Sequence, residues 1–114
     1  MHELSIIANL YEIMEEKARE QGGKKITFVK LQVGILSGVV PDLLETAFGI
    51  FKEGTMASDA RLEIEKVPLK IKCLDCGAEQ TSDELIFICQ KCGSSQVETL
   101  DGTELILEKM DLLI

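Results

Sequence analysis

The chain has 114 residues, of which 46% are hydrophobic and 28% are charged, so it can bury one modest core with at most a small appended module. Its formal charge of -8 repels phosphate backbones and argues against a nucleic-acid partner. The sequence shows no signal-peptide pattern, and no apolar window approaches the roughly 20 residues that span a bilayer. We therefore expect a small cytoplasmic protein that does not bind membranes and is not a multidomain enzyme.

The first half of the chain predicts a helix, a strand and a second helix. Apolar residues recur at spacings of three and four from Leu4 to Ala18, which is typical of an amphipathic helix. Residues 26–35 are rich in β-branched and apolar side chains and predict a strand covered on both sides at its start. We place Val29, Leu31, Val33 and Ile35 on one face of this strand, and Ile26 and Phe28 on the other.

Glycine and proline mark the elements that follow. We interpret Gly34 and Gly38 as part of the turn that ends the strand rather than as sites of close backbone approach. Pro41 suits the first turn of a second helix, and Gly54 marks its end. Two further strands are expected, one near residues 62–68 and one near residues 104–113.

The order of these elements predicts an α+β fold, with two helices packed on a small three-stranded sheet. We assign Leu105 and Leu107 to one face of the last strand and Ile106 and Met110 to the other. Because both faces are apolar, this strand needs the cover of the main sheet and is expected to return there. The segment between the last two strands then becomes an inserted four-cysteine module. The expected domains are an α/β domain of residues 1–70 and 97–114 and an inserted zinc ribbon of residues 71–96.

The cysteine pattern is the strongest chemical signal in the sequence. Cys73 and Cys76 form one C-x-x-C-G motif and Cys89 and Cys92 form a second, with twelve residues between the two. This spacing is typical of four-cysteine zinc ribbons, in which all four thiolates bind one tetrahedral ion and leave no open position for catalysis. Zinc in a structural role is the favoured interpretation. Iron in a rubredoxin-like site is the nearest alternative, followed by disulfides, free core thiols or a redox pair.

The second candidate site lies at the N-terminus. His2 is the only histidine and follows Met1 directly, so its imidazole, its own backbone nitrogen and the terminal amine can chelate one metal ion. Ni(II) and Cu(II) favour such planar nitrogen donors, and Glu3 can add a fourth donor or orient the site. The alternative is a solvent-exposed terminal histidine followed by an acidic residue in a first helical turn, which is the commoner situation at chain ends.

The sequence as a whole resembles one known family. The start Met1-His2-Glu3-Leu4-Ser5, the segments Leu31-Gln32-Val33-Gly34 and Ser37-Gly38-Val39, and the double C-x-x-C-G motif are together similar to the HypA/HybF family of hydrogenase and urease nickel-maturation proteins. The resemblance covers essentially the whole chain.

This resemblance implies a nickel metallochaperone rather than an enzyme. It implies nickel binding at Met1, His2 and Glu3, and structural zinc at Cys73, Cys76, Cys89 and Cys92. The implied partners are a nickel GTPase and the large subunit of [NiFe]-hydrogenase, with urease maturation proteins in addition. We expect a monomer or a weak homodimer. Two other interpretations stay open at this point, a zinc-ribbon interaction adaptor and a rubredoxin-like electron carrier.

Overall fold

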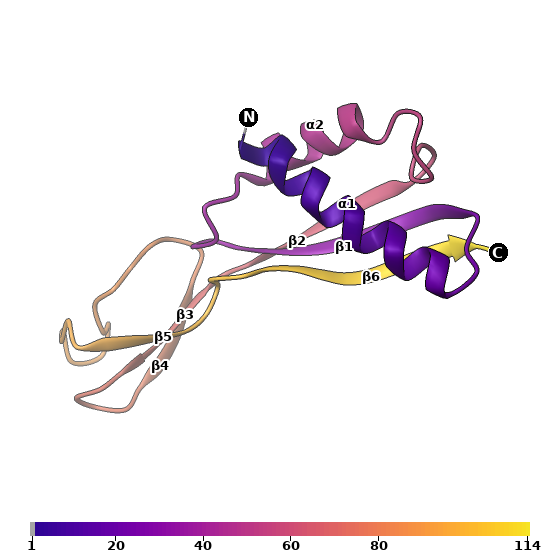
Figure 1. The fold of residues 1–114 in the computed structure, drawn as a ribbon. Helices are drawn as coiled ribbons and strands as arrows, with labels where there is room; N and C mark the ends of the chain where they lie inside the picture. Colours follow the sequence, from indigo (N-terminus) through magenta and orange to yellow (C-terminus); the bar gives the residue numbers. More distant parts are fainter. Residues whose placement is uncertain (1) are drawn as a thin grey trace.

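The computed structural model describes residues 2–114, and the side chains from Glu3 onward. This part of the chain contains two helices and six strands (Figure 1). The helices are α1 (His2–Glu20) and α2 (Pro41–Phe51). The strands are β1 (Lys25–Gly34), β2 (Arg61–Val67), β3 (Leu69–Cys73), β4 (Glu79–Ser82), β5 (Val97–Asp101) and β6 (Leu105–Leu113). Neither helix is long and apolar enough to cross a membrane.

The first sheet has the strand order β2-β1-β6, with β1 parallel to β2 and antiparallel to β6. Parallel neighbours need a crossover connection, and α2 provides it between β1 and β2. Figure 1 shows α1 and α2 on the same side of this sheet. The predicted fold class, two helices on a three-stranded sheet with an inserted cysteine module, is confirmed.

Irregular pairing in two strands corrects the predicted sheet faces. A register shift between Ile26 and Phe28 returns Ile26 to the helix side, where it is buried beside Val29. A β-bulge adds one residue and so reverses the alternation of side chains. A second shift in β6 has the same effect, so Met110 packs against the core while Ile106 is 41% exposed. The last strand does join the main sheet, but the helices cover only one face.

The uncovered face of the first sheet carries charged side chains. Lys30 lies at its centre, with Nζ 3.0 Å from Glu108, 3.2 Å from Glu65 and 3.5 Å from Glu63. The hydrogen bond to Glu108, with that to Glu65, raises the pKa of Lys30 above its usual value. Opposite charges on neighbouring strands stabilise the pairing modestly and keep this face hydrated.

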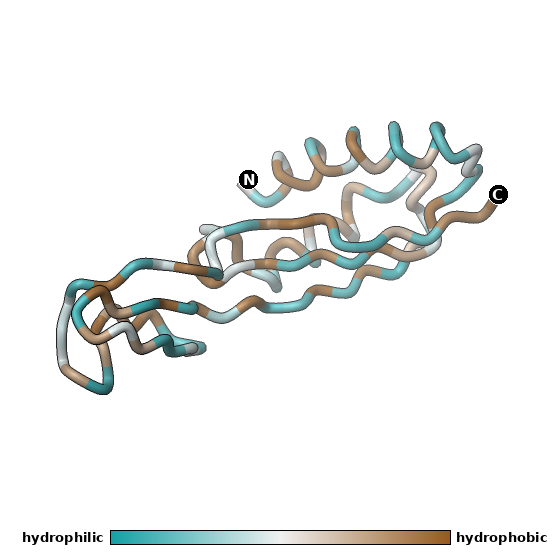
Figure 2. The backbone as a smooth tube through the Cα atoms, turned by 90° about the horizontal axis from the view of Figure 1, so that it is seen from below, coloured by the Kyte–Doolittle hydropathy of each residue, from teal (hydrophilic) through white to brown (hydrophobic). Residues whose placement is uncertain are grey.

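The second sheet has the order β4-β3-β5 and is entirely antiparallel. It extends from one end of the first sheet, as the view in Figure 2 also shows. The molecule is therefore elongated, with a radius of gyration of 17.5 Å against about 13 Å for a compact chain of this length. The second sheet spans residues 69–101, and we define these residues as the cysteine module. Its independence as a domain stays a prediction.

A tight backbone crossing joins the two sheets. A Cβ atom on Gly34 would overlap the backbone of Gly102 and lie 2.9 Å from the Thr103 nitrogen. The Leu36 amide donates to the Gly102 carbonyl at 2.7 Å, and the Gly34 amide donates to the Glu104 carbonyl at 2.9 Å. The interpretation of Gly34 as a simple turn residue is therefore wrong. Gly38 does adopt a positive φ, of 79°, in open space, as a turn glycine should.

Candidate metal centre

The two C-x-x-C-G motifs fold into two matching turns. In the first, the Gly77 amide donates to the Cys73 carbonyl at 2.9 Å, and in the second the Gly93 amide donates to the Cys89 carbonyl at 2.8 Å. Both glycines have positive φ, 78° and 77°, a conformation that side chains disfavour. The final glycine of each motif is therefore what allows the chain to turn so that both sulfurs of a pair face the same point.

The structure brings the four predicted cysteines together. All four Sγ atoms lie within 4.8 Å of one another. The Sγ atoms of Cys73 and Cys92 are 3.6 Å apart, as are those of Cys76 and Cys89. These separations are too long for disulfides. They are close to the roughly 3.8 Å that follows from four Zn–S bonds of about 2.3 Å in a tetrahedron.

Backbone amides stabilise negative charge on two of the sulfurs. The Cys76 amide points at the Cys73 sulfur and the Cys92 amide at the Cys89 sulfur, each at 3.4 Å. These amides lower the pKa of Cys73 and lower the pKa of Cys89 to about 6. The Ser94 amide also favours the Cys92 thiolate, but the neighbouring Cys73 sulfur and burial outweigh it and raise the pKa of Cys92 to about 12. Four thiolates so close together therefore need a cation to neutralise their charge.

Side-chain hydrogen bonds hold the two motifs in place. Gln80 on β4 binds the backbone on both sides of Cys89. Its Nε2 donates to the Ile88 carbonyl at 2.9 Å, and its Oε1 accepts from the Gln90 amide at 3.0 Å. The Ser94 hydroxyl donates to the Asp75 carboxylate, which links the second turn to the first. Sequence reasoning missed Gln80, because a single amide side chain that hydrogen-bonds to backbone leaves no periodic or motif signal.

The cysteine set fits a tetrahedral, thiolate-preferring ion that plays a structural role. Cys73 and Cys89 are each only 1% exposed, and Cys76 and Cys92 are exposed. Four sulfurs complete the coordination of zinc and leave no position for a substrate. Within residues 3–114, these cysteines form the only group of three or more Cys, His, Asp or Glu side chains placed to share an ion.

The structure leaves the N-terminal candidate site largely undescribed. Met1 lies outside the described residues, and the side chain of His2 is not described, although α1 begins at His2. Glu3 is half-buried and lines a groove between the start of α1 and α2. The grouping of Met1, His2 and Glu3 around one nickel ion stays a prediction.

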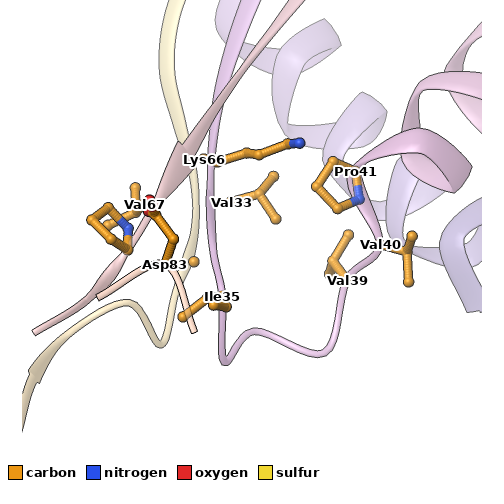
Figure 3. A pocket seen from close by; sticks show the side chains of 10 residues that line it. Val33, Ile35, Val39, Val40, Pro41, Lys66, Val67 and Asp83 are labelled. Carbon is orange, nitrogen blue, oxygen red and sulfur yellow. The ribbon is translucent and has the colours of Figure 1, made fainter. Parts of the chain in front are cut away.

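A separate hollow lies where the two sheets meet. It has a volume of about 570 Å³ and is lined mainly by apolar side chains, among them Val33, Ile35, Val39 and Val67 (Figure 3). Lys66 and Asp83 supply its charged groups. This lining includes none of the cysteines and offers no set of ligands for a soft metal ion.

Residues 1–112 match the family model described as "Hydrogenase/urease nickel incorporation, metallochaperone, hypA". This match defines the class of protein as one that handles nickel during enzyme maturation. The hydrogenase maturation factor HypA of Aquifex aeolicus is 46% identical over 98% of this chain and 97% of its own. HypA of Moorella thermoacetica is 44% identical over 95% of this chain and 96% of its own.

Solved structures agree with these matches. The solution structure of the Ni metallochaperone HypA from Helicobacter pylori is 29% identical and superposes with a TM-score of 0.69 over 97% of each chain. A second HypA solution structure is 30% identical with a TM-score of 0.72, over 99% of this chain and 97% of the other. The chain therefore belongs to the HypA family. Its relatives are named as maturation factors and metallochaperones, which are not enzymes.

Proposed function

We propose that the protein binds Ni(II) at its N-terminus and helps insert it into the large subunit of [NiFe]-hydrogenase, while a structural zinc ion holds the cysteine module. The observation that carries the proposal is the family match, which begins at residue 1 and so includes the Met-His-Glu start. The nickel ligands are the Met1 amine, the backbone nitrogen and imidazole of His2, and Glu3 in support. Nitrogen donors in a plane suit Ni(II).

Zinc is the proposed occupant of Cys73, Cys76, Cys89 and Cys92. The close spacing of the four sulfurs and the amides directed at two of them support a tetrahedral thiolate site. The two proposed sites have different roles because their donor atoms differ. A site closed by four thiolates retains its ion, whereas a site built from terminal nitrogens is accessible to a partner that takes the metal. Nickel is the cargo and zinc the resident ion.

The proposed partners follow from the family. A maturation factor acts with other components of its pathway, and we propose the nickel GTPase and the hydrogenase large subunit in that role, with urease maturation proteins in addition. The proposed site of action is the cytoplasm, and the proposed state is a monomer or weak homodimer.

Metal titration of untagged protein tests the proposal. Calorimetry should detect one tight nickel site in the wild type, and this site should be lost in His2→Ala and in a form whose terminal amine is acetylated. Elemental analysis should find one zinc per chain in all three forms, because the cysteines lie in a separate module. Equal nickel binding by all three forms would place the nickel site elsewhere.

The same four sulfurs also suit iron, so a rubredoxin-like electron carrier is the second candidate. An iron-loaded protein would be coloured after aerobic purification, whereas the zinc form is colourless. This observation separates the two candidates before any titration.

A further inference from the structure

The four cysteines form two close pairs, and each pair joins the two C-x-x-C-G motifs. The Sγ atom of Cys73 in the first motif lies 3.6 Å from that of Cys92 in the second. The Sγ atoms of Cys76 in the first motif and Cys89 in the second are also 3.6 Å apart. Bond formation along these two contacts would therefore link the motifs to each other and would not close either motif on itself.

The two members of each pair differ in their exposure to solvent. Cys76 and Cys92 are exposed, whereas Cys73 and Cys89 are each only 1% exposed. A dissolved oxidant reacts with a cysteine according to its thiolate character and its accessibility, so reaction should begin at the exposed sulfur. The buried sulfur of the same pair lies beside it. Each pair therefore holds one sulfur that an oxidant reaches and a second that can react with the oxidised first.

The chemistry of one pair balances with one molecule of hydrogen peroxide. The exposed thiolate attacks the peroxide, so that an S–O bond forms, the O–O bond breaks and hydroxide leaves. The buried thiolate then attacks the sulfenic sulfur, so that an S–S bond forms, the S–O bond breaks and a second hydroxide leaves. The two sulfurs lose two electrons in total and the peroxide gains two. Solvent protons convert the two hydroxides to water, and the second pair consumes a second peroxide.

The cysteine module depends on whatever joins its two motifs. Within residues 69–101, Leu69, Ile71 and the two buried cysteines are the only buried side chains. A core of this size does not hold a fold without a metal ion or disulfides. A change in the bonding of the four sulfurs therefore affects the whole module.

We infer that hydrogen peroxide converts the cysteine site into two disulfides, Cys73–Cys92 and Cys76–Cys89, which hold the module after its metal ion is lost. Zinc binds thiolates, so oxidation of both pairs leaves the site without ligands. Both disulfides connect the same two motifs that the ion connects. A thiol reductant restores the four thiolates. The inference rests on the proposed resident zinc only for the ion that is displaced.

Peptide mapping of the zinc-loaded wild-type protein tests the pairing. After treatment with hydrogen peroxide, the remaining thiols are blocked with iodoacetamide and the chain is cleaved after lysine and before aspartate. These cuts place the four cysteines on separate peptides, residues 73–74, 75–82, 83–91 and 92–100. Mass spectrometry should find the first peptide joined to the fourth and the second joined to the third. A chromogenic chelator should record the release of one zinc per chain as the disulfides form.

Cys76→Ser and Cys92→Ser are a matched pair of variants, because each removes the exposed sulfur of one pair and keeps the other pair complete. Peroxide should form only the Cys73–Cys92 disulfide in Cys76→Ser and only the Cys76–Cys89 disulfide in Cys92→Ser. Circular dichroism shows whether each variant is folded. The wild-type map decides the pairing where a variant does not fold.

Hydrogen exchange tests whether the disulfides replace the ion. Amides of β3 should exchange at least about tenfold more slowly in the peroxide-treated protein than in reduced protein whose zinc has been chelated, because the two cross-links constrain the open chain. Reduction of the treated protein with a dithiol, followed by addition of zinc, should restore one bound zinc per chain.

The outcomes keep this inference apart from the proposed function. Disulfides within a motif, any other pairing, sulfinic acids without disulfides, or zinc that stays bound after oxidation would each overturn the inference. So would equal β3 exchange in the oxidised and the chelated protein. A protein isolated without zinc would instead overturn the proposed resident ion, and the peptide map would still test the pairing because it requires only the four thiols.

Discussion

The substitution Gly34→Ala tests whether the crossing between the two sheets is as tight as its geometry indicates. The added Cβ would overlap the Gly102 backbone and lie 2.9 Å from the Thr103 nitrogen. These are backbone atoms tied by hydrogen bonds, so a side-chain rotation cannot relieve the overlap. Overpacking of this kind costs about 1–3 kcal/mol, against which alanine restricts the unfolded chain and returns about 0.4–1 kcal/mol. Because the overlap is with backbone atoms, the cost should lie near the upper end of this range, about 3 kcal/mol, and we expect a net loss of about 2 kcal/mol.

The expected change in melting temperature follows from chain length. An unfolding entropy of about 2.1 cal/mol/K per residue gives roughly 4 °C per kcal/mol for a chain of this size. The melting temperature of the zinc-loaded protein, followed by circular dichroism, should therefore fall by about 8 °C. Gly49→Ala is the matched control: Gly49 lies within α2, where an added Cβ would meet no neighbouring atom within 4 Å, and alanine should stabilise the helix by about 0.5–1 kcal/mol. A Gly34→Ala protein that melts within about 2 °C of the wild type would refute the reasoning.

Three further predictions concern the metals. Gln80→Met should release zinc to a chelator up to about thirtyfold faster, because it removes two hydrogen bonds beside Cys89 worth about 1 kcal/mol each. The control is Gln96→Met, because the Gln96 side chain makes none of the described hydrogen bonds. Equal rates of zinc release from the two variants would contradict the role of Gln80. Nickel affinity measured by calorimetry should fall as pH drops from 8 to 6. Protons compete with nickel for the terminal amine and the His2 imidazole, whose reference pKa values are about 8 and 6.5. A nickel affinity that does not change with pH would exclude both ligands. Zinc removal should expose the amides of the cysteine module to hydrogen exchange, while amides of β1 such as that of Leu31 stay protected. Amides of the cysteine module that keep their protection would contradict a metal-dependent fold.

The elements of the α/β core could be predicted because each has a clear period. The expected helix from Leu4 to Ala18 lies within α1, and the strand expected at residues 26–35 corresponds to β1. The assignment of Ile26 to a face failed because a bulge changes the alternation by one residue, and periodicity carries no sign of where the register shifts. The close approach at Gly34 was missed for a similar reason, since its partner Gly102 lies far away in the chain.

The candidate sites differ in how far the sequence determines them. The cysteine site could be predicted because two cysteines with two residues between them can both bind one ion. The folded chain does bring both pairs together. The supporting hydrogen bonds of Gln80 depend on β4, whose four residues Glu79–Ser82 are all polar and carry no strand pattern. The exposure of Leu43 and Ile50 on α2 was also missed. Apolar residues in a helix are interpreted as core until the packing shows which of them stay exposed to solvent.

The separation of the two proposed metals follows from both chemistry and position. Thiolates bind nickel as well as zinc, so affinity alone does not keep nickel out of a cysteine site. A site already filled by zinc, with two ligands buried at 1% exposure and both motifs braced by side chains, exchanges its ion slowly. Under the proposed assignment, nickel would bind the nitrogen ligands at the N-terminus. The zinc ion would then contribute to specificity as well as to folding, because it would occupy the only cysteines in the chain.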